Sequence, residues 1–74
     1  MTHLPSLKAR DIMRVLYKLG FVAKRQKGSH IFFEHLDGRT TLMPKHGGED
    51  TSRGLLRQIL REIKLAPADF MDLL

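Results

Sequence analysis

An Asp37-Gly38 pair between two β-type segments is the feature that most limits how this chain can fold. A type I′ turn needs positive φ at both central residues, and Asp-Gly is one of the pairs that tolerates this backbone best. The segment His30–Leu36 before the pair is rich in aromatic and branched side chains. We therefore predict an antiparallel hairpin in which Arg39–Met43 is the returning strand. Pro44 should end it, because proline cannot donate to a strand ladder.

The register of this hairpin decides which side chains meet across it. With a two-residue turn, Leu36 lies opposite Arg39, and counting outward places His30 opposite Lys45. The run Ile31-Phe32-Phe33 does not alternate between apolar and polar residues. The pattern therefore leaves open which face of the sheet carries His30.

Two stretches with helical periodicity flank the predicted strands. Apolar residues along 7–19 recur at i, i+3, i+4 and i+7, which is one face of an amphipathic helix. Ser6 is its expected N-cap and Gly20 its expected C-terminal cap. A second amphipathic stretch follows Thr51 or Ser52, either of which is suited to cap a helix.

Two further segments complete the predicted fold. Phe21–Gln26 is interpreted as a first strand, and Ala68–Leu74 as a short C-terminal helical turn that packs Phe70 and Leu73 onto the core. The order is helix, three-stranded antiparallel sheet, helix and helical turn, which is an α+β fold. Helices covering one sheet face would bury both apolar stripes and leave the other face free as a working surface.

Length and composition narrow the class of protein. Seventy-four residues suit one domain, 1–74, with a thin core. The absence of cysteine excludes disulfides, thiolate zinc sites and a cysteine nucleophile. Without a signal core or an apolar run of ~20 residues, we expect a soluble, cytoplasmic protein with no membrane contact. The net charge of +5 favours a polyanion such as nucleic acid, although an acidic protein is equally compatible.

His30 follows the cations Lys24, Arg25 and Lys27 and is the residue best suited to chemistry. Imidazole titrates near pH ~6.5, so it can give or take a proton at neutral pH. Metal-free RNA cleavage needs a base for the 2′-OH, an acid for the departing 5′-oxygen, and cations beside the phosphate. We therefore predict that His30 is a catalytic acid or base. The alternative is a polar histidine at the sheet edge with no role.

Other residues around His30 are predicted to assist it. His46 lies one residue beyond Lys45 and is either a possible second proton-transfer group or an ordinary loop histidine. Ser29 is disfavoured as a nucleophile, because neighbours in a strand point to opposite faces. The predicted RNA contacts are Lys24, Arg25, Lys27, Ser29 and Lys45.

The remaining histidines and the arginine rows have simpler explanations. His35 lies opposite Thr40 in the same register and is interpreted as a cross-strand residue. No two histidines have the i, i+4 spacing of a zinc helix, and no carboxylate cluster completes a site, so no metal and no cofactor are predicted. Basic residues recur every fourth position on both helices, where they either grip phosphates or form solvated faces.

The order of several short motifs resembles the HicA family, also described as YcfA-like. The motifs are Leu19-Gly20-Phe21, Lys27-Gly28-Ser29-His30, Asp37-Gly38, Pro44-x-His46-Gly47 and Gly54-Leu55-x-x-x-Ile59-Leu60. The resemblance implies a double-stranded-RNA-binding-domain-like fold and an RNA-cleaving toxin that inhibits translation. It places the family's catalytic histidine at His30, with an antitoxin of the HicB type over the basic face. Many relatives have Gly-Thr where this chain has Gly54-Leu55.

Together the residues and the resemblance predict a metal-independent endoribonuclease, an mRNA interferase of a type II toxin–antitoxin pair. Its partners would be mRNA and a HicB-like antitoxin. A non-catalytic RNA-binding module of the same fold, in which His30 stacks on or hydrogen-bonds to RNA, is the alternative function.

Overall fold

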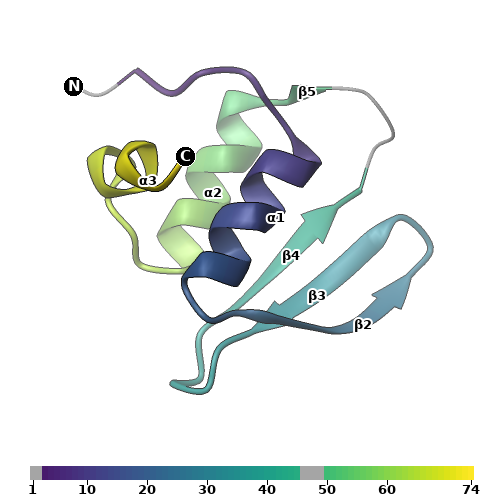
Figure 1. The fold of residues 1–74 in the computed structure, drawn as a ribbon. Helices are drawn as coiled ribbons and strands as arrows, with labels where there is room; N and C mark the ends of the chain where they lie inside the picture. Colours follow the sequence, from purple (N-terminus) through teal and green to yellow (C-terminus); the bar gives the residue numbers. More distant parts are fainter. Residues whose placement is uncertain (1–2, 46–49) are drawn as a thin grey trace.

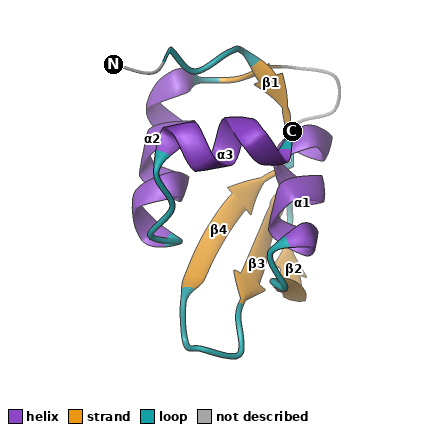
Figure 2. Cartoon of the chain, turned by 60° about the vertical axis from the view of Figure 1, so that its left-hand side comes forward, coloured by secondary structure: helices purple, strands orange, loops and turns teal. Residues whose placement is uncertain are grey.

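The computed structural model describes residues 3–45 and 50–74 (Figure 1). Its elements are β1 (Leu7–Lys8), α1 (Ala9–Lys18), β2 (Val22–Lys27), β3 (His30–Glu34), β4 (Thr40–Pro44), β5 (Asp50–Thr51), α2 (Arg53–Glu62) and α3 (Pro67–Leu73). Strands β2, β3 and β4 form an antiparallel meander, and α1 and α2 lie on the same face of it (Figure 1, Figure 2). The predicted α+β fold is confirmed. None of the described helices is long and apolar enough to cross a membrane.

The hydrophobic core lies between the helices and the inner face of the sheet. Each helix contributes an apolar stripe, and alternate residues of β3 and β4 point inward to meet these stripes. Helix α3 lies across α1 and α2 and contributes Phe70, as the sequence predicts (Figure 2). The largest fully buried side chains are Phe21, Phe33, Phe70, Leu4, Ile12, Leu16, Met43, Leu56, Ile59, Ile63 and Val15.

The start of α1 differs from the prediction. The helix begins at Ala9, two residues later than expected, and the cap residue is Lys8 rather than Ser6. Residues 7–8 instead form β1, which pairs with β5 in a short ladder (Leu7 opposite Thr51). The Asp11 carboxylate accepts a hydrogen bond from the Lys8 backbone N–H at 3.2 Å. This carboxylate takes the place of the predicted serine cap.

The end of α1 follows the prediction. Gly20 has φ +97° and directs the chain away from the helix. The Gly20 N–H donates to the Tyr17 carbonyl and the Phe21 N–H to the Leu16 carbonyl, both at 3.0 Å, which is the Schellman pattern. Phe21 then folds back and is buried. The Gly20 turn and the buried Phe21 therefore lead the chain from the end of α1 directly into β2.

Helix α2 is capped at its start by Ser52, one of the two predicted caps. The Ser52 hydroxyl accepts a hydrogen bond from the Leu55 N–H at 3.1 Å. At its end Lys64 has φ +57°, and the Lys64 and Leu65 N–H groups donate to Arg61 and Leu60. A second Schellman motif thus ends α2, with lysine where glycine is usual.

The turn of the hairpin differs from the prediction. The loop is Leu36-Asp37-Gly38, closed by hydrogen bonds from the Gly38 N–H to the His35 carbonyl (2.9 Å) and from the His35 N–H to the Arg39 carbonyl (2.8 Å). Only Gly38 among these has positive φ. Asp37 instead accepts the Arg39 N–H on its carboxylate, which favours a three-residue loop over a type I′ turn.

The extra loop residue shifts the register by one. His30 lies opposite Pro44 rather than Lys45, and His35 lies opposite Arg39 rather than Thr40. Both predicted pairings were therefore wrong.

Candidate functional site

The uncovered face of the sheet carries His30. Along β3, Ile31 and Phe33 are buried against the helices, whereas His30 and Phe32 point to the opposite side. The His30 ring is exposed and has no hydrogen bond to another described residue. The structure thus answers the question that the Ile-Phe-Phe pattern left open, and it leaves both ring nitrogens accessible.

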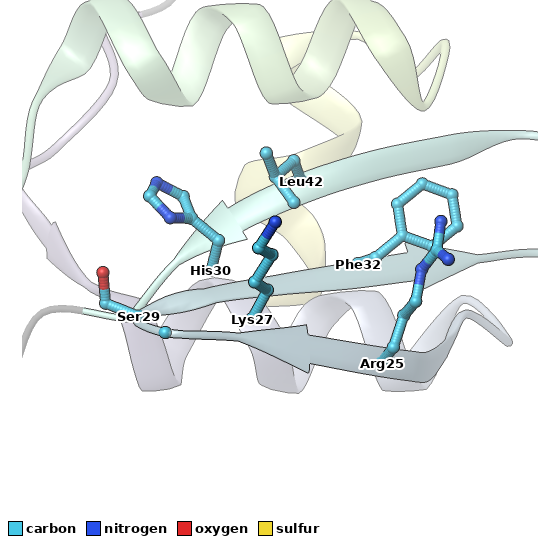
Figure 3. Close-up of a pocket in the computed structure, with 7 residues that line it drawn as sticks. Arg25, Lys27, Ser29, His30, Phe32 and Leu42 are labelled. Carbon is cyan, nitrogen blue, oxygen red and sulfur yellow. The ribbon is translucent and has the colours of Figure 1, made fainter.

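Strand pairing arranges this face in two rows. Lys27, His30 and Pro44 are cross-strand neighbours in one row, and Arg25, Phe32 and Leu42 are neighbours in the other. Figure 3 shows the side chains of Lys27, His30, Phe32 and Leu42 projecting from the same side of the sheet. All of these residues except Pro44 line a shallow pocket of about 740 Å³, together with Gly28 and Ser29. Facing pairs in such a ladder have Cβ atoms ~5 Å apart, so the Lys27 ammonium lies within reach of a group bound at His30.

The turn between β2 and β3 forms the end of the pocket. Gly28 has φ +60°, which suits the first central residue of a two-residue hairpin turn, and Ser29 is the second. The Gln26 side-chain amide donates to the Gly28 carbonyl at 3.1 Å and fixes the turn. Because Ser29 lies in the turn and not in the strand, strand alternation does not separate it from His30. Both residues line the same pocket.

The predicted cation cluster is divided between two hollows. Lys27 lines the His30 pocket, Lys24 and Lys45 line a second hollow between β2 and α1, and Arg25 lines both. For Lys24 the cause is strand alternation: Arg25 and Lys27 are two residues apart and share the open face, whereas Lys24 is the direct neighbour of Arg25 and points to the other side. His46, the possible second proton-transfer group, lies outside the residues that the structure describes.

Two residues of the pocket were not identified from the sequence. Phe32 is half-buried and the Arg25 guanidinium lies over its ring, 5.2 Å from the centroid. Leu42 beside it on β4 is 48% exposed, which is high for leucine. If Ile31 and Phe33 are both assigned to the core, strand alternation forces Phe32 onto the open face. That signal was present in the sequence.

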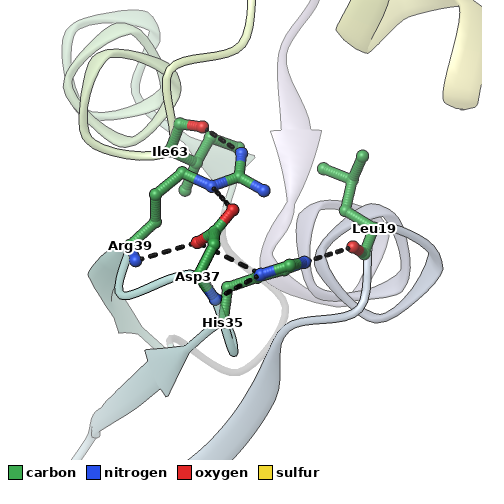
Figure 4. A network of polar contacts seen from close by, with 5 residues as sticks. All are labelled: Leu19, His35, Asp37, Arg39 and Ile63. Atoms are coloured by element: carbon green, nitrogen blue, oxygen red, sulfur yellow. Dashed lines mark hydrogen bonds and ion pairs between the residues drawn. The ribbon is translucent and has the colours of Figure 1, made fainter.

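A separate polar network holds the other end of the hairpin (Figure 4). The His35 Nε2 atom lies 3.0 Å from the Leu19 carbonyl, and the Asp37 N–H donates to its Nδ1 at 3.1 Å. The same Nδ1 atom also lies 3.1 Å from the Asp37 carboxylate. The Arg39 guanidinium donates to the Asp37 carboxylate at 2.8 Å and to the Ile63 carbonyl. His35 therefore joins the hairpin to the end of α1, which is a structural role.

The same network shifts the acidity of one carboxyl group. The pKa of Asp37 is lowered, chiefly by the hydrogen bond from the Arg39 N–H and further by the Arg39 guanidinium, against an opposing effect of burial. Among the residues that the structure describes, no three histidine, aspartate or glutamate side chains gather in the way that metal ligands do.

The basic rows on the helices differ in their surroundings. On α1, Arg14 pairs with Asp11 at 2.5 Å and the Lys18 ammonium donates to the Leu73 carbonyl at 2.9 Å. On α2, the arginines are exposed on the surface away from the core and no ion pair joins them to other described residues; they are Arg53, Arg57 and Arg61. The arginines of α2 are therefore more available to an outside ligand than the basic residues of α1.

An α+β fold with an exposed histidine beside cations defines a small basic protein suited to a polyanionic ligand. Residues 9–65 match the model of the HicA toxin family, the HicA toxins of bacterial toxin–antitoxin pairs. The chain belongs to this family, and the resemblance noted from its short motifs is confirmed. A search of curated proteins found no match.

Proposed function

We propose that this toxin is an endoribonuclease that cleaves mRNA without a metal ion and so inhibits translation, with His30 transferring a proton. The observation that carries the proposal is the position of His30. The ring is exposed on the open sheet face, directly opposite Lys27 and beside a glycine turn that lets a phosphodiester approach the backbone.

The proposed reaction is an internal transfer at phosphorus. The 2′-OH loses its proton and its oxygen attacks the adjacent phosphorus, while the bond from phosphorus to the 5′-oxygen breaks and that oxygen gains a proton. The products are a 2′,3′-cyclic phosphate and a 5′-OH. His30 carries out one of the two proton transfers, and His46 or water carries out the other. Lys27 and Arg25 stabilise the charge that grows on the phosphate oxygens.

A cleavage assay in excess EDTA tests this proposal. Wild type should cut a long single-stranded RNA, and His30→Ala should be slower by about 10²- to 10⁴-fold, the usual contribution of a positioned acid or base. His3→Ala is the matched control, because His3 is also exposed and lies far along the chain from the pocket. Equal cleavage by wild type and His30→Ala would contradict the catalytic role. RNA binding without cleavage by either protein would favour the non-catalytic binding module.

We further propose that a HicB-type antitoxin neutralises the toxin in the cytoplasm by covering the open sheet face. Its contact surface would be acidic, complementary to Arg25 and Lys27. Addition of the antitoxin should then abolish cleavage and protect these two residues from chemical modification. Protection confined to the α2 arginines would contradict this placement.

A further inference from the structure

Next to the His30 row, the open sheet face carries an aromatic and apolar row that acid–base chemistry does not require. Phe32 stands at its centre on β3, with Arg25 on one side and the half-exposed Leu42 on the other. Residues two apart on a strand are ~7 Å apart. The aromatic row is therefore about one nucleotide's length away from His30, on the same face of the sheet.

The chemistry of this row fits a nucleobase. A half-buried aromatic ring with a guanidinium over it offers flat surfaces on which a base can stack, and Leu42 extends the apolar area (Figure 3). A base inside a duplex is already stacked on both faces and cannot reach a shallow pocket on a sheet. Only an unpaired base can use this platform.

Resting on the proposed function, we propose that Phe32 and Arg25 form a stacking platform for an unpaired base adjoining the phosphate at His30. The platform makes the toxin select single-stranded RNA, although its fold resembles a double-stranded-RNA-binding domain. Since every base has a flat face, stacking alone sets little sequence preference. Phe32 is then a specificity-determining residue that distinguishes single-stranded from double-stranded RNA and does not distinguish one base sequence from another.

The test uses the full chain and a short single-stranded oligonucleotide with 2′-O-methyl sugars, which cannot be cleaved by 2′-OH attack. One base is replaced by 2-aminopurine, whose fluorescence falls when it stacks. Wild type should bind the probe and quench the fluorescence. Phe32→Leu should weaken binding by about 5- to 100-fold and lose the quenching, as expected for one stacked base. Phe32→Tyr should retain both.

Two controls separate stacking from general effects. Leu36→Ala removes a fully exposed apolar side chain at the far hairpin end and should leave binding unchanged. With unmodified protein, an abasic nucleotide should weaken binding at one position of the probe and not at the others, so the test does not depend on the folding of Phe32→Leu. Annealing the probe to its complement stacks the 2-aminopurine within the duplex, and addition of the protein should then cause no further fall in fluorescence.

The inference would be overturned if folded Phe32→Leu bound the probe as tightly as wild type, or if an abasic nucleotide left the affinity unchanged at every position of the probe. An effect of Phe32→Leu on capture of an acidic antitoxin alone would also overturn it, because the row would then be a protein interface. If wild type cleaves RNA but shows no base dependence, the proposed function stands without this platform. If it quenches the probe but cuts no cleavable RNA, the platform stands and the ribonuclease proposal fails.

Discussion

Lys64 adopts a left-handed backbone, φ +57°, at the position after α2 where glycine is usual. This conformation costs an L-residue ~1 to 2 kcal/mol, since its Cβ lies close to the following carbonyl oxygen. Lys64→Gly should therefore raise the free energy of unfolding by about 1 kcal/mol, measured by urea denaturation. Lys64→Ala is the control, because it removes the charge but keeps the strain. Equal stabilisation by both variants would assign the effect to charge.

Asp37 makes the stability of the folded state depend on pH in the acid range. A carboxyl group whose pKa is lowered on folding stabilises the folded state above its unfolded pKa near 3.8, and the stabilisation is lost as the pH falls through the lower folded pKa. Asp37→Asn should therefore be less stable than wild type at neutral pH, and the difference should shrink in strong acid. Denaturation midpoints measured across this range check the prediction. A difference that stays constant with pH would contradict it.

At the residue scale, the sequence singled out His30 next to a cluster of cations. It left open which face of the sheet carries His30, and it did not show which of the cations share that face. Lys24 and Lys45 follow the same basic pattern as Arg25 and Lys27. Strand alternation directs Lys24 to the other hollow, and the one-residue shift of the hairpin register does the same for Lys45. The register shift depends on which backbone groups a turn side chain hydrogen-bonds to, as Asp37 does to the Arg39 N–H. Amino-acid composition does not predict such a contact.

At the scale of single elements, α2 contains a glycine that its neighbours do not require. A Cβ added at Gly54 meets no atom within 4 Å, and Gly54 is not among the glycines with positive φ. Gly54→Ala should raise the free energy of unfolding by about 1 kcal/mol, because alanine loses less backbone entropy in a helix. Thermal or urea unfolding measures the change.

Gly20 provides the matched comparison for Gly54. It has φ +97°, and an added Cβ would lie 3.1 Å from the His35 Nε2 atom. Gly20→Ala should destabilise the protein, since it strains the end of α1 and crowds the His35 hydrogen bond. The same sign of change for both substitutions would contradict the assigned roles.

The elements that were predicted well carry long periodic signals. The apolar stripes of both helices repeat over many residues, so an error at one position is corrected by the others. β1 and β5 span two residues each and carry no period to detect. The hairpin turn failed for a different reason: Asp-Gly suits two loop types, and the Arg39 N–H decided between them.

For the whole molecule, two of the positively charged surfaces could each bind RNA. The open sheet face carries Arg25 and Lys27, and the outer face of α2 carries an arginine row. If RNA lies on the sheet face, Lys27→Gln should reduce the slope of log affinity against log salt by about 0.7, the value for one contact to a single strand. Arg57→Gln makes the same charge change on α2 and should leave the slope unaltered. The reverse result would place the RNA along α2.

The central claim is that His30 serves an internal 2′-OH attack on an RNA phosphate, and the ends of the cleavage products test it most directly. The account predicts fragments with 2′,3′-cyclic phosphates and 5′-OH groups, formed in excess EDTA and absent with His30→Ala. Fragments with 3′-OH and 5′-phosphate ends, formed only when divalent metal is supplied, would contradict it. They would mean that water attacks the phosphorus and that His30 has another task.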